Sequence, residues 1–391
     1  MVEIPDDYQD ALSTTGVATL TALGALEAAA RYLHPPEIPQ LRHALAPHFS
    51  ELERALAVYR AATPPAPLAA FHARFAEGAE LTRRSLEMFL AAAGPNEAIV
   101  KMLASLRTFC RALEALYGLH RFPPLSRYFV EAPFHDRLAR LETAPPEGIT
   151  VGLHHSGGER GADVRGGFCL YVPESYDGSE AWPLVVALHG GSGSGRDFLW
   201  SWLREARGRR FLLAAPTAQG PTWSLMGPDQ DSRSLRAMVG YIASHWRVDR
   251  SHVLLTGLSD GATYTLLEGL AEGNPFTHLA PVSGVLHPAN LVGGNLARAA
   301  GRKIWLVHGR LDWMFPVATA EMAAEELTKA GADITLRIIE DLSHTYPREE
   351  NDRILGWFDP RLALPVTDDA DATVSVGGGA AGARSVRGTP A

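Results

Sequence analysis

Apolar residues recur every three to four positions through most of the first 117 residues, a spacing typical of amphipathic helices. The segment is rich in Ala, Leu and Glu, and the pattern is interrupted by prolines at 35–39, prolines at 64–67 and the pair Gly94-Pro95. The clearest apolar stripe follows Asn96 and comprises Ile99, Met102, Leu103, Leu106, Phe109, Cys110, Leu113 and Leu116. We predict four helices packed as a small bundle, in which Pro47 either divides the second helix or begins its longer half.

A stretch punctuated by prolines follows at 121–147. It carries the aromatic residues Phe122, Tyr128, Phe129 and Phe134. Aromatic side chains are large apolar groups, and their removal from water lowers the free energy of the folded protein. We therefore predict a connector that packs against the rest of the protein and is not a free linker.

From Gly148 onward, short apolar runs alternate with helical patterns. Strands are predicted at 149–154, 168–172, 184–188, 211–214, 253–256, 279–282, 304–307 and 334–339, and helices at 198–207, 233–246, 262–271, 319–330 and 349–358. Such alternation is typical of α/β proteins with a mostly parallel sheet, here of about eight strands, covered by helices on both faces. The first two strands are separated by a Gly-rich loop and are expected to form an antiparallel edge.

These patterns predict the domain organisation of the chain. We expect an all-helical bundle at 1–120 that acts as a lid or a support, the connector at 121–147, and a catalytic α/β domain at 148–362. The segment 366–391 is rich in Gly and Ala and offers little to bury, so a disordered tail is predicted there.

Composition excludes several classes of protein. The net charge of −8, with no local cluster of Lys and Arg, argues against a nucleic-acid surface. The two cysteines, Cys110 and Cys169, lie far apart, which argues against a disulfide framework and favours a reducing compartment. No secretion signal opens the sequence and no apolar run is long enough to span a bilayer, so we expect a cytoplasmic protein. The sequence leaves homo-oligomerisation open.

Candidate chemistry begins at Gly257-Leu258-Ser259-Asp260-Gly261. This G-x-S-x-G pentapeptide lies between the apolar run VLLT and the helical pattern from Ala262, and strand, G-x-S-x-G, helix is the pattern of a nucleophile elbow. A Cβ at either glycine is expected to collide with neighbouring backbone, because the serine must lie on a tight turn. Outside that context, the same five residues would predict only an ordinary tight turn.

A nucleophilic serine needs a base, and the base needs an acid that orients it. Asp312 follows the predicted strand at 304–307, and His344 follows the strand at 334–339, so both are expected at the sheet edge where Ser259 lies. The order Ser, Asp, His is that expected for an elbow of this kind. Asp341 is the second candidate for the acid. Among other histidines after the elbow, His308 is expected to hold the loop of Asp312, and His287 precedes the acid.

A glycine-rich loop, His189 to Gly195, follows the predicted strand at 184–188. Glycines allow backbone N–H groups to approach a substrate oxygen, so we expect the amides of Gly191 and Asp260 to form an oxyanion hole. A phosphate-binding loop is the alternative, but the G-K-[ST] ending is absent. Four aromatic residues in loops beside the expected site are candidates to line a substrate pocket, although each could instead be core packing: Trp223, Trp313, Phe315 and Tyr346.

Four segments in this order carry a resemblance to known proteins: PLVVALHGGSG, VLLTGLSDGA, WLVHGRLDWMFP and DLSHTYP. Over about 148–360 the chain resembles α/β-hydrolases, nearest to the phospholipase/carboxylesterase-like branch and to the polyhydroxybutyrate-depolymerase/feruloyl-esterase-like branch. The resemblance implies an α/β-hydrolase fold, a nucleophile at Ser259, an acid at Asp312, a base at His344, and oxyanion amides from Gly191 and Asp260. It implies no metal and no organic cofactor.

The resemblance also implies a carboxylesterase-type reaction on a small-molecule ester. One departure concerns the residue after the serine: acyl-thioesterase members of the branch usually carry Gln there, whereas this chain carries Asp260, which puts a protein-deacylating role in doubt. A peptidase or amidase of the same fold and a non-catalytic binding protein are the alternatives.

Overall fold

Four long antiparallel helices form the N-terminal part of the computed structural model, which describes residues 4–91, 95–158 and 161–365. The helices are α1 (Asp6–Arg31), α2 (Ile38–Ala61), α3 (Ala69–Leu90) and α4 (Pro95–Tyr117), and the short helices η1 (Pro35–Glu37) and η2 (Ala66–Leu68) lie at the proline clusters. The predicted bundle is therefore present.

The expectation for Pro47 is wrong, because α2 continues through this residue. A proline inside a helix removes one N–H donor and leaves the carbonyl four residues earlier, that of His43, without its helical partner. Both Pro47 and His43 are exposed. Water can therefore satisfy the freed carbonyl, which lets the helix tolerate the proline.

The connector at 121–147 forms short helices and packs against the protein. These are α5 (Pro123–Tyr128), η3 (Ala132–Arg137) and α6 (Leu138–Leu141). Phe129 and Phe134 are buried, and Phe134 forms a small apolar cluster with Val130 and Leu141.

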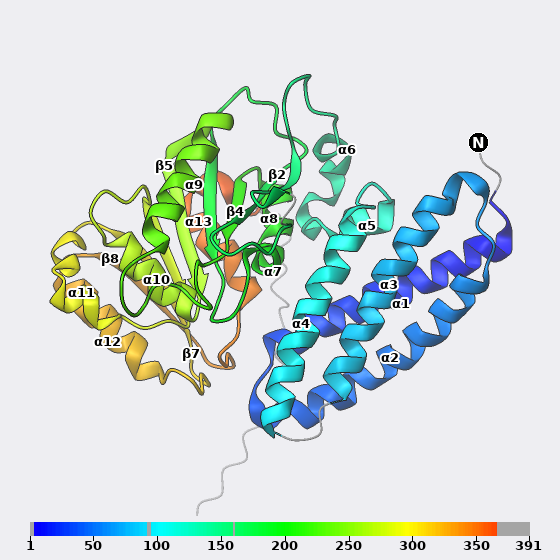
Figure 1. The fold of residues 1–391 in the computed structure, drawn as a ribbon, viewed down its shortest axis with the longest axis horizontal. Coiled ribbons are helices and arrows are strands. Elements are labelled where there is room, and N and C mark those ends of the chain that lie inside the picture. Colours follow the sequence, from blue (N-terminus) through cyan, green and yellow to red (C-terminus); the bar gives the residue numbers. More distant parts are fainter. Residues whose placement is uncertain (1–3, 92–94, 159–160, 366–391) are drawn as a thin grey trace, which may run out of the picture.

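An eight-stranded sheet forms the centre of the C-terminal part (Figure 1). Its strands are β1 (Gly152–His155), β2 (Phe168–Val172), β3 (Trp182–Leu188), β4 (Leu212–Pro216), β5 (Val248–Leu258), β6 (His278–Val282), β7 (Lys303–Gly309) and β8 (Asp333–Ile339). The strand order is β1-β2-β4-β3-β5-β6-β7-β8; the pairs β1–β2 and β2–β4 are antiparallel and the others are parallel. The predicted sheet, with its antiparallel edge, is confirmed.

Helices cover both faces of this sheet. They are α7 (Gly195–Phe198), η5 (Leu199–Ser201), α8 (Leu203–Arg209), α9 (Asp231–His245), α10 (Asp260–Gly269), α11 (Pro288–Val292), η6 (Asn295–Arg298), α12 (Val317–Lys329), η7 (Arg348–Glu350), α13 (Asn351–Phe358) and η8 (Pro360–Leu362). Side chains alternate along β3: Val185 packs on the face that α7, α8 and α13 cover, whereas Leu184 and Val186 pack on the face that α9, α10 and α12 cover.

The single helix predicted at 198–207 is wrong in detail, because three short helices occupy this stretch. The chain turns at Trp202, whose φ of −129° is not helical and whose side chain is fully buried. The tail predicted at 366–391 lies outside the described residues. None of the helices in the described part of the chain combines the length and the apolar character that a bilayer span requires.

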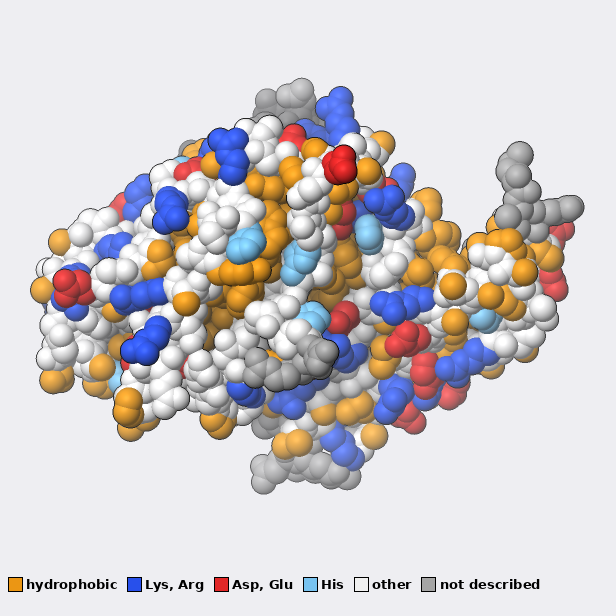
Figure 2. Space-filling model, turned by 45° about the horizontal axis from the view of Figure 1, so that its top comes forward, with side chains coloured by type: hydrophobic (Ala, Val, Ile, Leu, Met, Phe, Trp, Pro, Cys, Tyr) orange, Lys and Arg blue, Asp and Glu red, His pale blue; other side chains and the backbone are white. Residues whose placement is uncertain are grey.

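The helical bundle packs on the same side of the sheet as α7, α8 and α13 (Figure 1). One continuous cluster of buried apolar side chains includes Leu23 and Leu56 of the bundle and Val185 and Leu213 of the sheet. The two parts of the molecule therefore share an apolar core. Figure 2 shows Lys, Arg, Asp and Glu side chains interspersed over the surface of the bundle, as for a solvated face.

Candidate active site

Ser259 lies at the sharp turn between β5 and α10. Its φ of +58° and ψ of −120° are rarely adopted by residues with a side chain, and such a conformation costs on the order of 1–3 kcal/mol. The turn is held by a hydrogen bond from the Ser259 N–H to the Val282 carbonyl, 3.0 Å, and by another from the Thr263 N–H to the Ser259 carbonyl, 2.9 Å. The serine is 8% exposed. This is the geometry expected of a nucleophile elbow.

The two glycines of the pentapeptide are required by close backbone contacts. A Cβ on Gly257 would lie 2.6 Å from the Gly261 carbonyl carbon, and a Cβ on Gly261 would lie 2.5 Å from the His189 carbonyl oxygen. Real Cβ atoms essentially never come within 3.0 Å of such atoms. The glycines therefore allow α10 to start directly against the end of β3.

The structure brings Ser259, Asp312 and His344 together. His344 Nε2 lies 2.9 Å from Ser259 Oγ, and His344 Nδ1 lies 2.8 Å from Asp312 Oδ2. An ionised carboxylate only accepts hydrogen bonds, so Nδ1 carries the proton and the neutral ring presents the lone pair of Nε2 to the serine hydroxyl. Asp312 follows β7, and His344 follows β8. The arrangement can remove a proton from Ser259.

Asp312 is buried, and its other oxygen is also occupied. Oδ1 accepts hydrogen bonds from the backbone N–H groups of Met314, 2.9 Å, and Phe315, 2.8 Å. Burial alone would raise the pKa of Asp312, but the hydrogen bonds from His344 and from the Phe315 N–H outweigh it and lower that pKa below its ordinary value. Asp312 is therefore charged at neutral pH and suited to stabilising an imidazolium at His344.

The other candidates for acid and base have different partners. His308 is fully buried, and its Nε2 lies 2.8 Å from the Phe315 carbonyl, so it holds the loop of Asp312, as expected. His287 caps α11 by accepting the Ala289 N–H. The Asp341 carboxylate is largely exposed and pairs with Arg31, 2.9 Å. Only His344 faces the serine among these residues.

The glycine-rich loop lies directly beside the elbow. A Cβ on Gly190 would lie 3.6 Å from Ser259 Cβ, and one on Gly191 would lie 2.8 Å from Asp260 Oδ2. The loop is anchored by His189, whose Nδ1 lies 2.6 Å from the Gly190 carbonyl and whose Nε2 accepts the Ala218 N–H, 3.1 Å. Neither the Gly191 N–H nor the Asp260 N–H has a hydrogen-bond partner among the described residues. Both amides are therefore free to bind a substrate oxygen.

Asp260 contributes more than its backbone to this region. Its Oδ2 accepts a hydrogen bond from the Thr222 hydroxyl, 2.6 Å, and is the oxygen closest to Gly191. A negative charge beside an anion-binding site opposes a second negative charge there. The carboxylate of Asp260 is thus expected to disfavour substrates that carry an anionic group close to the reacting carbonyl.

The four aromatic candidates for a substrate pocket divide into two pairs. Phe315 and Trp313 lie beside the imidazole of His344, with ring centroids 5.3 Å and 6.5 Å away, and Trp313 is 47% exposed. Trp223 is buried, and its indole N–H donates to the His189 carbonyl, 2.7 Å. Tyr346 packs against the core, and its hydroxyl donates to Asn351 Oδ1. The expectation for Trp223 and Tyr346 is therefore corrected: both support the core and offer little surface to a substrate.

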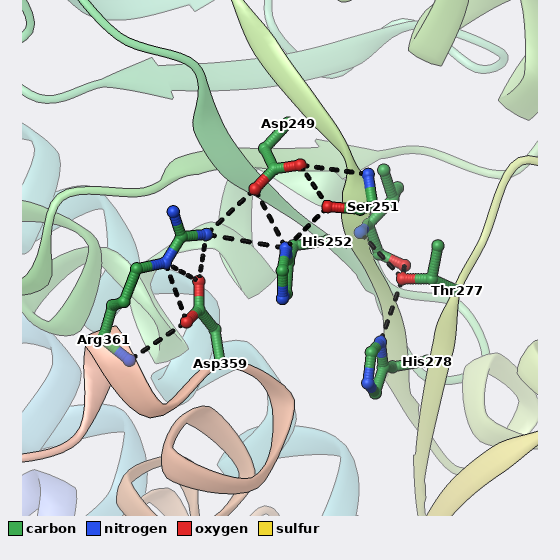
Figure 3. A network of polar contacts seen from close by, with 8 residues as sticks. Asp249, Ser251, His252, Thr277, His278, Asp359 and Arg361 are labelled. Atoms are coloured by element: carbon green, nitrogen blue, oxygen red, sulfur yellow. Dashed lines mark hydrogen bonds and ion pairs between the residues drawn. The ribbon is translucent and has the colours of Figure 1, made fainter.

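A second group of Ser, His and Asp lies at the start of β5, at the other end of this strand from Ser259. Figure 3 shows its polar contacts. His252 Nδ1 lies 2.9 Å from Asp249 Oδ2 and 3.0 Å from Ser251 Oγ. Because one nitrogen makes both contacts, the ring cannot pass a proton from the serine to the carboxylate. Arg361 joins Asp249 to Asp359 by ion pairs of 2.9 Å and 2.6 Å. The group fastens η8 to the start of β5 and is structural.

An open cavity of about 860 Å³ lies between the β1–β2 pair and the C-terminal end of α9, away from Ser259. Its lining combines aromatic side chains, such as Tyr241 and Trp246, with three histidines, His154, His155 and His245. In the middle of the view in Figure 2 the surface is hollowed, with hydrophobic side chains at the bottom of the hollow and histidines beside it, in agreement with this lining. No group of three or more His, Cys, Asp or Glu arranged to hold a metal ion occurs among the described residues.

Sequence analysis missed two residues that contact the loop of His344. They are Arg31 and His34, at the end of α1 and just before η1. Their partners lie more than 300 positions later in the chain. No local pattern signals such a contact.

Comparison with known families supports the assignment of the fold. Residues 227–357 match the model of the phospholipase/carboxylesterase family, and this stretch includes the elbow, Asp312 and His344. The resemblance drawn from the motifs is confirmed for that stretch. That stretch is similar to the phospholipase/carboxylesterase family. No curated protein matches the chain.

Solved structures similar to this chain include three enzymes. A thermostable esterase is 19% identical, with a TM-score of 0.42 and coverage of 49% of this chain and 58% of that one. An acetyl xylan esterase from Aspergillus awamori is 17% identical, with a TM-score of 0.41 and coverage of 49% and 93%. An acyl-protein thioesterase 2 from Zea mays is 18% identical, with a TM-score of 0.38 and coverage of 50% and 99%. The chain thus spans just over half the length of the thermostable esterase, and similarity at this level says nothing about the substrate.

Proposed function

We propose that this protein is a serine hydrolase that cleaves carboxylic esters through Ser259, His344 and Asp312. The observation that carries the proposal is the continuous chain of hydrogen bonds from the serine hydroxyl to a buried, charged carboxylate, 2.9 Å and 2.8 Å long. The serine also lies at the N-terminus of α10, beside two backbone N–H groups that have no hydrogen-bond partner in the described part of the chain. Nucleophile, base, orienting acid and oxyanion donors are the complete set that acyl transfer needs.

The reaction proceeds in two steps. His344 Nε2 takes the proton of Ser259 as Oγ attacks the ester carbonyl, and Asp312 stabilises the imidazolium that forms. The amides of Gly191 and Asp260 bind the oxyanion, and α10 points its positive end toward the same oxygen. The tetrahedral intermediate expels the alcohol, which takes the proton from His344. Water, activated by the same imidazole, then releases the acid from the acyl-enzyme. None of these steps needs a metal or an organic cofactor.

The surroundings of the serine favour neutral esters with an apolar group. Leu311, Trp313 and Met314 are each between 43% and 48% exposed, and they flank the catalytic carboxylate in the loop after β7. Exposed apolar side chains grouped beside a reactive centre are typical of a surface that binds apolar substrate. The carboxylate of Asp260 opposes anionic substrates, as argued above. We propose that Trp313 and Phe315 contact the acyl or the alcohol group.

The test is hydrolysis of p-nitrophenyl esters of increasing acyl length. Ser259→Ala is expected to lower kcat by about 10⁴-fold or more, since the nucleophile is lost. Ser283→Ala is the matched control, because Ser283 is also a buried serine with positive φ at a strand end, but its hydroxyl contacts no catalytic group. Labelling with a fluorophosphonate, followed by mass mapping, should identify Ser259. Trp313→Ala should raise KM more for long acyl chains than for acetate.

Equal rates for wild type and Ser259→Ala would refute the assignment. Turnover of p-nitroanilides at rates similar to those of the esters would instead favour an amidase.

A further inference from the structure

The loop that carries His344 makes hydrogen bonds and an ion pair with the N-terminal helical part. Residues 340–347 belong to no helix or strand. Both neighbours of His344 are buried, and the hydroxyl groups of both contact the segment between the end of α1 and the start of η1. Ser343 Oγ lies 3.0 Å from His34 Nδ1, and Thr345 Oγ1 donates to the Arg31 carbonyl, 2.9 Å. The base therefore sits between two contacts to the bundle.

Arg31 adds two ion pairs, one to the start of this loop and one to η7, which follows it. Its guanidinium contacts Asp341, 2.9 Å, and Glu349. Arg31 is largely buried although its acidic partners are about half exposed. Exposed ion pairs contribute little by themselves, so the importance of Arg31 lies in ordering the segment around His344.

On its inner side the loop lies against the end of β7 and the loop that follows it. The Leu311 N–H donates to the Leu342 carbonyl, 2.9 Å, and a Cβ on Gly309 would lie 2.2 Å from that same carbonyl oxygen. The end of β7 therefore limits the movement of the backbone at Leu342 and at the Ser343 carbonyl. The side chains of Ser343 and Thr345 contact the bundle instead.

The loop beside the oxyanion site has a similar contact. Arg107 of α4 donates to the Ser192 carbonyl, 3.1 Å, and Ser192 follows Gly191. Ser192 has a φ of +58°, which costs energy for a residue with a side chain. One helical turn further along α4, Arg111 pairs with Asp197 of α7. The bundle thus touches both loops that surround Ser259.

We propose that the N-terminal helical bundle is part of the catalytic apparatus. Arg31 and His34 are positioning residues for His344, and Arg107 is a positioning residue for the loop of Gly191. The proposal rests on the proposed function. Its physical basis is the strict distance dependence of proton transfer and oxyanion binding, because a displacement of about 1 Å in such a site can lower the rate about 100-fold.

Point variants test this better than removal of the bundle, because the bundle and the sheet share a core. Thr345→Val removes the hydroxyl without changing the shape of the side chain. Thr345→Ser keeps the hydroxyl and removes only the methyl group. His34→Ala and Ser343→Ala remove the second contact from either side. Ser85→Ala is the matched control: Ser85 is buried inside the bundle and exchanges hydrogen bonds of 2.9 Å and 2.7 Å with Ser105, far from the loop.

The measurements are kcat, KM, the rate of fluorophosphonate labelling and the unfolding midpoint. Thr345→Val and His34→Ala should each lower kcat and the labelling rate at least tenfold, with KM within about threefold of wild type. Thr345→Ser should recover most of the activity. Ser85→Ala should keep both rates even where its unfolding midpoint falls as far as that of Thr345→Val. The double variant His34→Ala/Ser343→Ala should be no slower than either single variant.

Two outcomes separate this inference from the proposed function. If wild type depends on Ser259 but Thr345→Val and His34→Ala keep its kcat, the bundle does not position His344. If wild type shows no turnover that depends on Ser259, the proposed function fails and the positioning role fails with it.

Discussion

Asp312 uses its two oxygens for different tasks. Oδ1 accepts the N–H groups of Met314 and Phe315, which fixes the carboxylate, and Oδ2 faces His344. This division orients the imidazole, because a carboxylate can accept hydrogen bonds at both oxygens. An amide in the same place would have one oxygen for two backbone donors and would turn its NH₂ group toward His344.

Asp312→Asn is therefore expected to reverse the tautomer of His344. With NH₂ donating to Nδ1, the proton would lie on Nε2, and the ring could no longer accept the proton of Ser259. A loss of kcat of about 10⁴-fold follows, as for other enzymes with this constellation. Steady-state kinetics measure it, and the unfolding midpoint should stay close to that of wild type. A loss smaller than tenfold would contradict the orienting role.

Sequence reasoning located single residues well where they follow strands. Ser259, Asp312 and His344 each come just after a predicted strand, and the parallel sheet brings those ends to one edge. Whether a loop side chain faces the core or the solvent is harder to predict. Trp223 and Tyr346 lie in the expected loops but turn inward, because only the folded chain decides whether a loop side chain faces the core.

At the scale of elements, the junction between β3, β5 and α10 sets the position of the serine. The start of α10 lies so close to the end of β3 that a Cβ on Gly261 would lie 2.6 Å from the Leu188 carbonyl oxygen and 2.5 Å from that of His189. Backbone atoms at this point cannot move without disturbing the glycine-rich loop that begins at His189.

Gly261→Ala is expected to lower the free energy of unfolding by about 2 kcal/mol or more and to lower kcat, because overpacking displaces backbone on both sides. Gly240→Ala is the control. Gly240 is exposed in α9 with nothing within 4 Å of a new Cβ, so alanine should raise the free energy of unfolding by about 0.5–1 kcal/mol. Urea unfolding measures both. Wild-type stability in Gly261→Ala would show that the contact is not limiting.

Element type was predictable from periodicity, but continuity was not. The strands and the four long helices follow from the apolar patterns. Two predictions of helix continuity were wrong: α2 passes through Pro47, where a break was expected, and the stretch 198–207, expected to be one helix, is split at Trp202. Both differences depend on whether a residue is buried in the folded protein: Pro47 is exposed and Trp202 is buried. The local sequence does not predict this.

For the whole molecule, buried neutral histidines link stability to pH. Burial chiefly lowers the pKa of His189 and of His278 to about 4, below the ordinary value of about 6.5. The unfolded chain therefore takes up protons between pH 6.5 and 4 that the folded chain does not. Stability is fully present above pH 6.5 and falls as the pH drops through this window, by on the order of 3 kcal/mol for each histidine.

His278→Phe should flatten this dependence. The ring of His278 packs edge-on against Trp357 and Phe358, so a phenylalanine ring fits in the same place. Figure 3 shows His278 and its contact with Thr277. Urea unfolding from pH 7 to pH 4 should show a slope smaller by about one proton than that of wild type. A curve parallel to that of wild type would mean that His278 does not titrate in this window.

The contacts of Arg31 join positions 310 and 318 residues apart. During synthesis on the ribosome, the bundle emerges long before the segment around His344. Arg31 and the rest of the bundle therefore wait through most of translation before their partners at 341 and 349 are made. If the proposed function holds, an incomplete chain that ends before these residues has a folded bundle but no activity.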